Sequence, residues 1–207
     1  MIEAILFDLD GVLVDSELHS CSATAELLTA RGLAMTEPEV RRLFLGKPFA
    51  AVYEHARNHG HELPQSLERE KEELYFEKAA NLVAFAGALD VLRRLRAPWA
   101  IASSGSPRKV AFSLKMTGIR AEIVCTTAEV QHGKPAPDLF LLAAKKLGIE
   151  ASKCAVVEDS VPGIQAAHAA GCFAIGVTTS MTLEADAVIA SIAELSSVPE
   201  IAHLFSP

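Results

Sequence analysis

The fold of this chain follows from one stretch near its start, Ile5-Leu6-Phe7-Asp8-Leu9-Asp10-Gly11-Val12-Leu13-Val14-Asp15. Its apolar beginning predicts a buried parallel strand that delivers carboxylates to its carboxyl end. In doubly wound α/β proteins, ligands bind at that end of the sheet. Gly11 lets the backbone turn, so Asp8 and Asp10 can approach one ligand in different roles. Two such carboxylates suggest a nucleophile and a general acid or base.

Length and composition indicate a globular protein of modest size. A chain of 207 residues, 50% hydrophobic, suits one domain that carries an insertion. Nineteen Lys and Arg against 26 Asp and Glu give a formal net charge of -7 at pH 7, which argues against nucleic-acid and membrane partners. The four scattered cysteines are typical of buried reduced thiols. The cysteines therefore predict a cytoplasmic protein. A monomer or a weak homodimer is expected, although the composition does not determine the oligomeric state.

An insertion follows the acidic stretch. The next convincing strand, Trp99–Ser103, begins 91 positions after Asp8, whereas a whole βαβ unit needs about 30 residues. The intervening segments are helical and unusually charged. We expect a core domain of residues 1–14 and 87–207 and a helical cap of residues 15–86 that excludes water and selects the substrate. The helices of the cap are expected at residues 16–31, 36–45, 49–58 and 67–83.

After Trp99, predicted strands and helices alternate at the spacing of a parallel sheet. Strands are expected at residues 122–125, 154–158, 173–177 and 187–189, and a surface helix at residues 199–205. The predicted fold class is α/β, a doubly wound, Rossmann-like parallel sheet with an inserted small all-helical cap domain.

This topology brings several polar residues to one edge of the sheet, namely Asp8, Asp10, Ser103, Lys134, Glu158 and Asp159. Converging carboxylates repel one another unless a cation lies among them, and carboxylates plus a substrate phosphate are the pattern for Mg²⁺. Lys134 and Ser103 would then contact the phosphate. Asp8 would attack phosphorus to form an aspartyl phosphate. Asp10 would bind the metal through its backbone carbonyl and exchange protons with the leaving group and water.

The chain resembles the haloacid dehalogenase-like (HAD) superfamily over essentially its full length. The resemblance rests on four motifs in order, Asp8-Leu9-Asp10-Gly11-Val12, Ser103 at a strand end, Lys134-Pro135, and Glu158-Asp159-Ser160 followed by Gly163. The insertion looks like the C1 cap of that superfamily. The run from Glu158 to Ala167 is similar to the β-phosphoglucomutase and phosphoglycolate phosphatase branch.

The resemblance implies a role for each motif residue. Asp8 becomes the nucleophile, Asp10 the acid/base, and Asp159 a direct Mg²⁺ ligand, with Glu158 acting partly through water. The expected catalytic residues are Asp8, Asp10, Ser103 and Lys134, and the expected metal ligands are Asp8, Asp10, Glu158 and Asp159. The expected substrate contacts are Leu9, Asp10, Ser103, Ser104, Lys134 and, in the cap, Lys47.

Two departures from that branch favour a phosphatase over a mutase. Phe49 stands where the mutases carry an arginine for the distal phosphate, and His19 falls one place early for their timing histidine. The predicted function is a magnesium-dependent phosphatase of a small phosphorylated metabolite, a sugar phosphate or phosphoglycolate. The alternative is a β-phosphoglucomutase-like phosphotransferase. Dehalogenases proper lack the second aspartate and need no metal, so Asp10 argues against them.

The sequence also bears on other classes of protein and on simpler roles for these residues. A phospho-acceptor signalling domain also uses an aspartate, Mg²⁺ and a lysine, but the long cap argues against it. A catalytically inactive binding protein would need an occluded site, because no motif residue is missing. Glu158 or Asp159 could instead cap the following helix, and Lys47 could be a surface lysine. The histidines His55, His59 and His61 suit a solvated surface better than a metal site.

Overall fold

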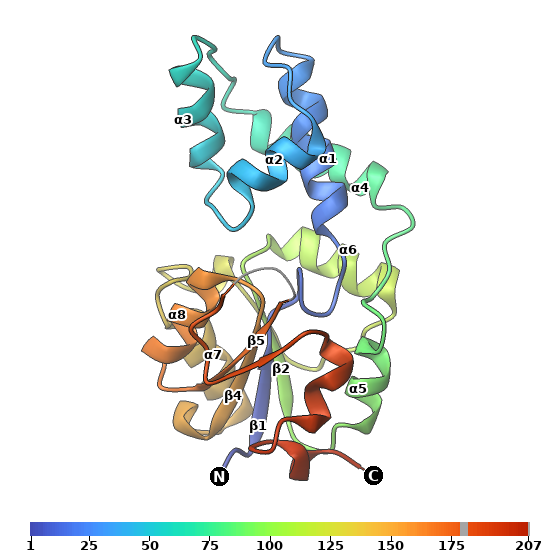
Figure 1. Ribbon diagram of the computed structural model, residues 1–207, viewed down its shortest axis with the longest axis vertical. Coiled ribbons are helices and arrows are strands. Elements are labelled where there is room, and N and C mark those ends of the chain that lie inside the picture. Colours follow the sequence, from blue (N-terminus) through green and yellow to red (C-terminus); the bar gives the residue numbers. More distant parts are fainter. Residues whose placement is uncertain (179–181, 207) are drawn as a thin grey trace. The chain divides into compact units, whose positions relative to one another are not determined.

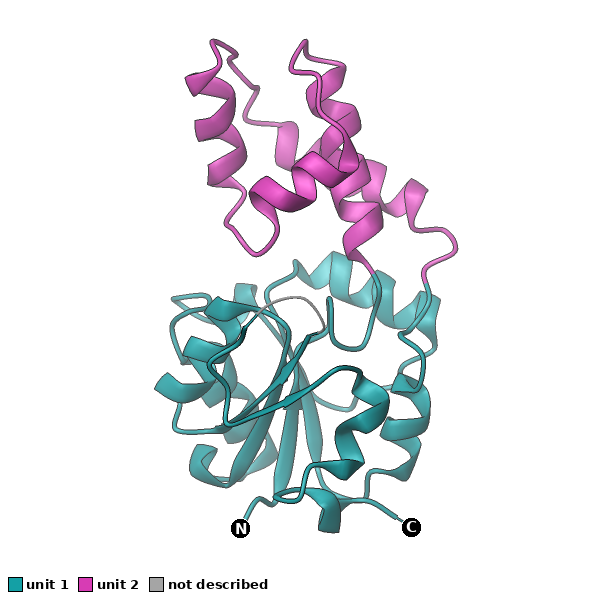
Figure 2. Cartoon of the chain, viewed as in Figure 1, with its two compact units in different colours: residues 1–15, 83–207 teal, residues 16–82 magenta. Residues whose placement is uncertain are grey.

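The computed structural model describes residues 1–178 and 182–206. The chain divides into two compact units (Figure 2). Unit 1 comprises Met1–Asp15 and Val83–Pro207, and unit 2 comprises Ser16–Leu82. Each unit has its own buried core and is described separately.

The unit boundaries differ by a few residues from the expected boundaries of the cap, 15–86. Backbone hydrogen bonds explain the difference. The N–H of Asp15 donates to the carbonyl of Val83 at 3.3 Å, and the N–H of Phe85 donates to the carbonyl of Leu13 at 3.0 Å. The segment that begins at Val83 is therefore paired with the acidic stretch and belongs to unit 1.

Unit 1 is built on a six-stranded parallel sheet with the order β3-β2-β1-β4-β5-β6 (Figure 1). The strands are β1 (Ala4–Phe7), β2 (Trp99–Ser103), β3 (Val124–Thr126), β4 (Cys154–Glu158), β5 (Phe173–Val177) and β6 (Ala187–Ile189). The predicted doubly wound α/β fold is confirmed. The strand expected at 122–125 starts at Val124, since only Val124–Thr126 pair in register with β2.

The central strand β1 explains why its sequence is a continuous apolar run. Its residues are fully buried, because layers cover both faces of the sheet. On one face, Leu6 belongs to a hydrophobic cluster with Leu139 and Ile164. Those residues lie on α7 (Asp138–Leu147) and α8 (Val161–Ala169) (Figure 1). Alternation turns Phe7 to the other face, where its ring packs edge-on against Trp99 at 5.8 Å between centroids.

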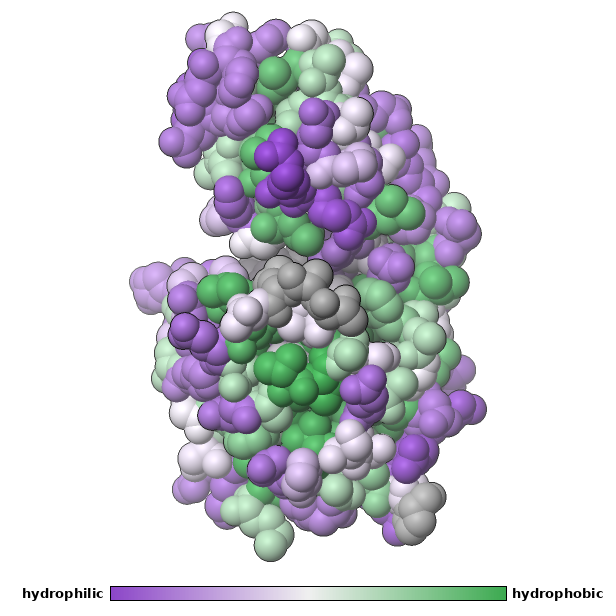
Figure 3. Space-filling view, in the orientation of Figure 1, coloured by the Kyte–Doolittle hydropathy of each residue, from purple (hydrophilic) through white to green (hydrophobic). Residues whose placement is uncertain are grey.

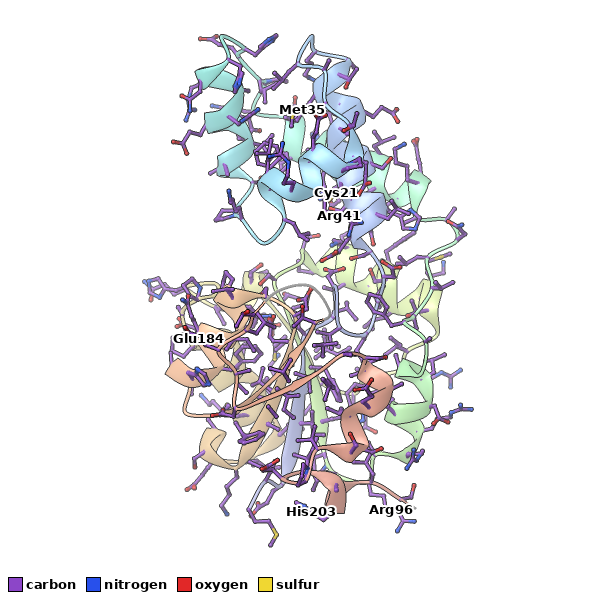
Figure 4. The ribbon with its side chains drawn as sticks, viewed as in Figure 1. Cys21, Met35, Arg41, Arg96, Glu184 and His203 are labelled. Atoms are coloured by element: carbon purple, nitrogen blue, oxygen red, sulfur yellow. The ribbon has the colours of Figure 1, made fainter. Side chains whose placement is uncertain are left out.

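The remaining helices of unit 1 are α5 (Ala88–Arg94) and α6 (Pro107–Thr117). Short 3₁₀ helices lie at Thr127–Glu129, Ala151–Lys153, Ile192–Ser197 and Ala202–Leu204. The prediction of a surface helix at residues 199–205 is therefore wrong, because only the 3₁₀ helix Ala202–Leu204 forms there. Contacts to distant segments hold this tail, since Phe205 forms a β-bridge with Leu95. The ring nitrogen Nε2 of His203, which is labelled in Figure 4, lies 2.9 Å from the carbonyl of Ile2.

Unit 2 is a small helical unit. Its helices are α1 (Glu17–Thr29), α2 (Glu37–Phe44), α3 (Ala50–Asn58) and α4 (Leu67–Lys78). Helix α1 packs against α2 and α4, and its Leu28 joins Val52 and Leu67 in the core. Glu39 accepts the backbone N–H of Thr36 at 2.8 Å, which completes the predicted capping box of α2. Helix α4, expected to reach residue 83, ends at Lys78.

Ion pairs join several charged side chains of unit 2. Arg41 pairs with Glu17 and Glu37, each at 2.9 Å, and Lys78 pairs with Glu26 at 2.7 Å. Arg41 lies near Cys21, where α2 meets α1 (Figure 4). The face of unit 2 in Figure 3 is mostly hydrophilic, whereas hydrophobic side chains gather on the corresponding face of unit 1.

Two further expectations concern the whole chain. The four cysteines, Cys21, Cys125, Cys154 and Cys172, are buried and free, as predicted. None of the helices within residues 1–178 and 182–206 combines the length and the apolar character required to cross a membrane.

Candidate active site

The strand order reverses direction at the centre of the sheet, between β1 and β4. From β1 the chain continues to β2 on one side, and from β4 it continues to β5 on the other. Ligand crevices in open α/β sheets lie at such a reversal, here between β1 and β4. Asp8 directly follows β1, Ser103 ends β2, and Glu158 ends β4. The topology therefore brings these three predicted residues to the same edge.

Lys134 lies at the centre of a buried charged cluster at this edge. Its ammonium Nζ donates to Asp8, to Glu158 Oε1 at 2.6 Å, and to the carbonyl of Ala102 at 3.1 Å. The side chains of Lys134, Asp8 and Glu158 are only 6%, 9% and 1% exposed. The Lys134 ammonium also lies 4.9 Å from the ring centroid of Phe140. One buried cation thus holds two buried carboxylates together.

Burial and ion pairing shift the pKa values of Asp8 and Lys134 in opposite directions. Burial raises the pKa of Asp8 to about 7, an effect that Lys134 opposes and Glu158 reinforces. Burial also acts to lower the pKa of Lys134, but the two carboxylates outweigh it and the pKa is raised above its usual value. Lys134 therefore stays charged, and its ammonium favours the ionised form of Asp8.

Glu158 is fixed by the start of α8 as well as by Lys134. Its Oε2 accepts the backbone N–H groups of Asp159 and Ser160, both at 3.0 Å, and the Ser160 hydroxyl at 2.8 Å. Ser160 Oγ in turn caps α8 by accepting the N–H of Gly163 at 3.1 Å. A Cβ on Gly163 would collide with the Glu158 carboxylate. Gly163 is therefore needed for space, and both Glu158 oxygens already accept hydrogen bonds.

Asp159 lies against the turn that follows β1. Gly11 has a φ of 84°, and a Cβ placed there would overlap the Asp159 carboxylate. The carboxylate thus occupies the space that a side chain would fill, beside the peptide that carries the Asp10 carbonyl. Carboxylates and a carbonyl are the hard oxygen ligands that Mg²⁺ prefers.

The described residues can therefore fit a magnesium ion, although not through side chains alone. No group of three or more His, Cys, Asp or Glu side chains in the described ranges is arranged to hold a metal. Magnesium is commonly held by one or two carboxylates, with a substrate phosphate and water completing the octahedron. Asp8 and Asp159, with the Asp10 carbonyl, match that pattern of donors.

Asp10 lies beside the loop that follows β2. Its Oδ2 accepts a hydrogen bond from Lys109 Nζ at 2.8 Å. Ser103 Oγ accepts the N–H of Gly105 at 3.1 Å, and a Cβ on Gly105 would lie 3.3 Å from Ser103 Oγ and 3.6 Å from Asp10 Oδ2. The sequence prediction missed Lys109. A helix that begins directly after a strand end at the active edge was the signal that could have identified it.

The other predicted contacts lie in different settings. The Leu9 side chain is fully buried, so only its backbone is available to a substrate. Ser104 is exposed, and its carbonyl accepts the Thr127 hydroxyl at 3.4 Å. Lys47 is exposed in unit 2, in the turn after α2. The rings of His55 and His59 lie with their centroids 4.2 Å apart and are tilted by 36° relative to each other.

Known proteins are similar to this chain over most of its length. The sequence model of one family, described as haloacid dehalogenase-like hydrolase, matches residues 2–171. Hexitol phosphatase A of Escherichia coli (strain K12) is 34% identical over 203 residues, which cover 94% of this chain and 93% of the relative. Protein SUPPRESSOR OF QUENCHING 1, chloroplastic, of Arabidopsis thaliana is 33% identical over 201 residues, and the match covers 90% of this chain and 19% of that protein.

A solved structure gives the same result for the fold. A HAD family hydrolase from Deinococcus radiodurans R1, with bound phosphate and sodium, superposes with a TM-score of 0.82 at 32% identity. The alignment covers 100% of this chain and 98% of the other. The family match includes every motif residue from Asp8 to Gly163.

Proposed function

The chain belongs to the haloacid dehalogenase-like hydrolase family, and on that premise we propose that it is a magnesium-dependent phosphatase of small phosphorylated metabolites. The observation that carries the proposal is the buried cluster of Asp8, Lys134 and Glu158 at the switch point of the sheet. A sugar or sugar-alcohol phosphate is the favoured substrate, because a relative that matches nearly the whole chain is named a hexitol phosphatase.

Asp8 is proposed as the nucleophile. Its carboxylate attacks phosphorus, the bond from phosphorus to the leaving oxygen breaks, and an aspartyl phosphate forms. The ammonium of Lys134 keeps Asp8 in position and reduces its repulsion by an anionic phosphate. Ser103, at the end of β2, is proposed to donate its hydroxyl to a phosphoryl oxygen.

Asp10 is proposed as the general acid and base. In the first step it gives a proton to the leaving oxygen, so that the metabolite departs as an alcohol. In the second step it takes a proton from water, whose oxygen attacks phosphorus and breaks the bond to Asp8. Inorganic phosphate is released and both aspartates return to their starting states.

The metal would be held by Asp8, Asp159 and the carbonyl of Asp10. When bound, Mg²⁺ neutralises part of the charge on the phosphoryl group. Glu158 is proposed to support the site by holding Lys134 and the start of α8, and its contact with the metal, through water or directly, stays a prediction.

Unit 2 is proposed to act as the cap that selects the substrate, with Lys47 as its contact. An exposed lysine suits an anionic or polyhydroxylated substrate. A location in the cytoplasm, a monomeric or weakly dimeric state and the lack of a nucleic-acid or membrane partner also stay predictions.

The test is phosphate release from a panel of metabolites, measured with Mg²⁺ and with a chelator. The panel should contain hexitol and hexose phosphates, phosphoglycolate and β-glucose 1-phosphate with its bisphosphate activator. We expect release that requires Mg²⁺ and is concentrated on a few substrates. Release that persists with chelator would remove the metal from the proposal, and isomerised sugar phosphate without release would establish a mutase instead.

A further inference from the structure

Lys109 contacts the residue proposed as acid and base. Its Nζ lies 2.8 Å from Asp10 Oδ2, and the two side chains are 17% and 24% exposed. We propose that Lys109 is a positioning residue that holds the Asp10 carboxylate where the leaving oxygen departs. The inference rests on the proposed function, since it assigns a role to a neighbour of the proposed acid.

The start of α6 fixes the backbone of Lys109. Ser106 caps the helix by accepting the N–H of Lys109 at 3.1 Å, and Pro107 occupies the first helical position. Lys109 thus lies in the first turn of a helix that begins just after β2. Side chains on a helix lean toward its N-terminus, so the Lys109 ammonium reaches back to the carboxyl edge of the sheet.

The turn that follows β1 fixes the backbone beside Asp10, and Lys109 contacts the Asp10 side chain. The N–H of the next residue, Gly11, donates to the carbonyl of Val14 at 3.0 Å, which closes the turn after β1. The Asp10 carboxylate lies on the partly exposed side of this turn, beside Gly105. The contact with Lys109 restricts its rotation there. A displacement of about 1 Å in a catalytic group can reduce a rate by ~10²-fold.

The proposed role predicts an effect that depends on the leaving group. An alkyl phosphate needs a proton from Asp10 as its alcohol leaves, whereas nitrophenolate leaves without one. If Lys109 positions the acid, its loss should slow the first reaction and spare the second. If Lys109 instead attracts the phosphate or supports the fold, both reactions should slow alike.

The experiment compares kcat/KM for p-nitrophenyl phosphate with kcat/KM for the alkyl phosphate that the panel favours, sorbitol 6-phosphate being the first choice. For Lys109→Met we expect a loss of about tenfold or more on the alkyl phosphate and less than about twofold on the aryl phosphate. Lys109→Arg, which keeps the charge, should recover much of the loss. Lys115→Met, the same change at an exposed position on α6, should leave both values unchanged.

Asp10→Asn separates this inference from the proposed function. We expect it to show the same selectivity for the leaving group with a larger loss, and the addition of Lys109→Met should then cause no further loss. Equal losses on both substrates in Lys109→Met, or no loss, would overturn the role of Lys109 while Asp10 kept its own. If Asp10→Asn itself lacked the selectivity, the proposed acid would be wrong and the Lys109 inference would fail with it.

Discussion

One charged cluster from each unit shows two opposite settings for charged side chains. In unit 1, Lys134 joins Asp8 and Glu158 in a cluster that is almost fully buried. In unit 2, Arg41 pairs with Glu17 and Glu37 while 39% of its side chain remains exposed. A buried charge is costly unless it is paired and hydrogen-bonded, whereas a surface pair contributes little. The difference teaches that charge content alone does not locate chemistry, because what matters is whether the charge is kept from water.

The largest expected effect tests whether the buried carboxylate is the nucleophile. Asp8→Asn keeps the volume and removes the attacking oxyanion, so phosphate release should fall by at least ~10³-fold. Lys134 would still have Glu158 and the carbonyl of Ala102, and circular dichroism should report an intact fold. In unit 2, Glu26→Gln should leave turnover unchanged. Substantial activity in Asp8→Asn would contradict the assignment.

The second prediction compares how much the cation of each cluster contributes to the free energy of unfolding. Lys134→Met leaves two buried carboxylates without their cation and should lower the free energy of unfolding by about 3–5 kcal/mol. Arg41→Met removes a charge of the same sign from the surface pairs of unit 2 and should cost about 0–1 kcal/mol. Urea unfolding of both variants provides the test. Equal losses would mean that burial does not distinguish the two clusters.

The third prediction concerns the metal. Asp159→Ala removes a proposed ligand that lies against Gly11, so the Mg²⁺ concentration for half-maximal activity should rise by ~10-fold or more. Titration calorimetry with Mg²⁺ should show the same weakening without substrate. His55→Ala in unit 2 is the control. A changed Mg²⁺ requirement in that variant would support a metal site at the histidines of unit 2.

The fourth prediction concerns the space that Gly163 leaves for the Glu158 carboxylate. In Gly163→Ala, alanine is the better helix former by about 1 kcal/mol, but its Cβ would collide with the Glu158 carboxylate. We expect a net destabilisation of about 1–3 kcal/mol together with reduced activity. In the control Gly60→Ala of unit 2, the new Cβ meets no neighbour within 4 Å, but the φ of 78° is unfavourable for alanine. This variant should therefore be less stable while its activity is unchanged. Unimpaired activity in Gly163→Ala would argue against a role of Glu158 in the active site.

The smallest effect is expected in unit 2. Lys47→Ala should change stability by less than about 0.5 kcal/mol, because the side chain is exposed. The ratio of kcat/KM between preferred and poor metabolites should fall several-fold, and release from an aryl phosphate should change less. An equal loss on all substrates would argue against a role in selectivity.

The sequence predicted best where the decisive forces are local. The strands Trp99–Ser103 and Cys154–Glu158 have the predicted bounds, because a fully buried apolar run followed by polar residues identifies its own ends. Helix α4 and the C-terminal tail were predicted less well. The segment that follows α4 pairs with Leu13 and Asp15, and the tail pairs with Leu95, so both depend on residues far away in the chain.

For the site, the sequence indicated which residues meet but not how they are paired. Four motifs on one edge identify Asp8 and Lys134 as neighbours. The distances between side chains in the structure show that Glu158 accepts hydrogen bonds from Lys134 and from the start of α8, and that Lys109 donates to Asp10. Leu9 illustrates the same limit, since a residue inside a motif can have a side chain that is wholly buried.

The hydrogen bonds that join Asp15 to Val83 and Leu13 to Phe85 have a consequence for how the chain tolerates change in length. They pair the two ends of the insertion with each other inside unit 1. The entropy of closing a flexible loop rises slowly, by only about 0.6 kcal/mol for each doubling of its length. A sequence between these two points can therefore lengthen, shorten or be exchanged in evolution while the carboxyl edge of the sheet, and the chemistry proposed for it, keeps its geometry.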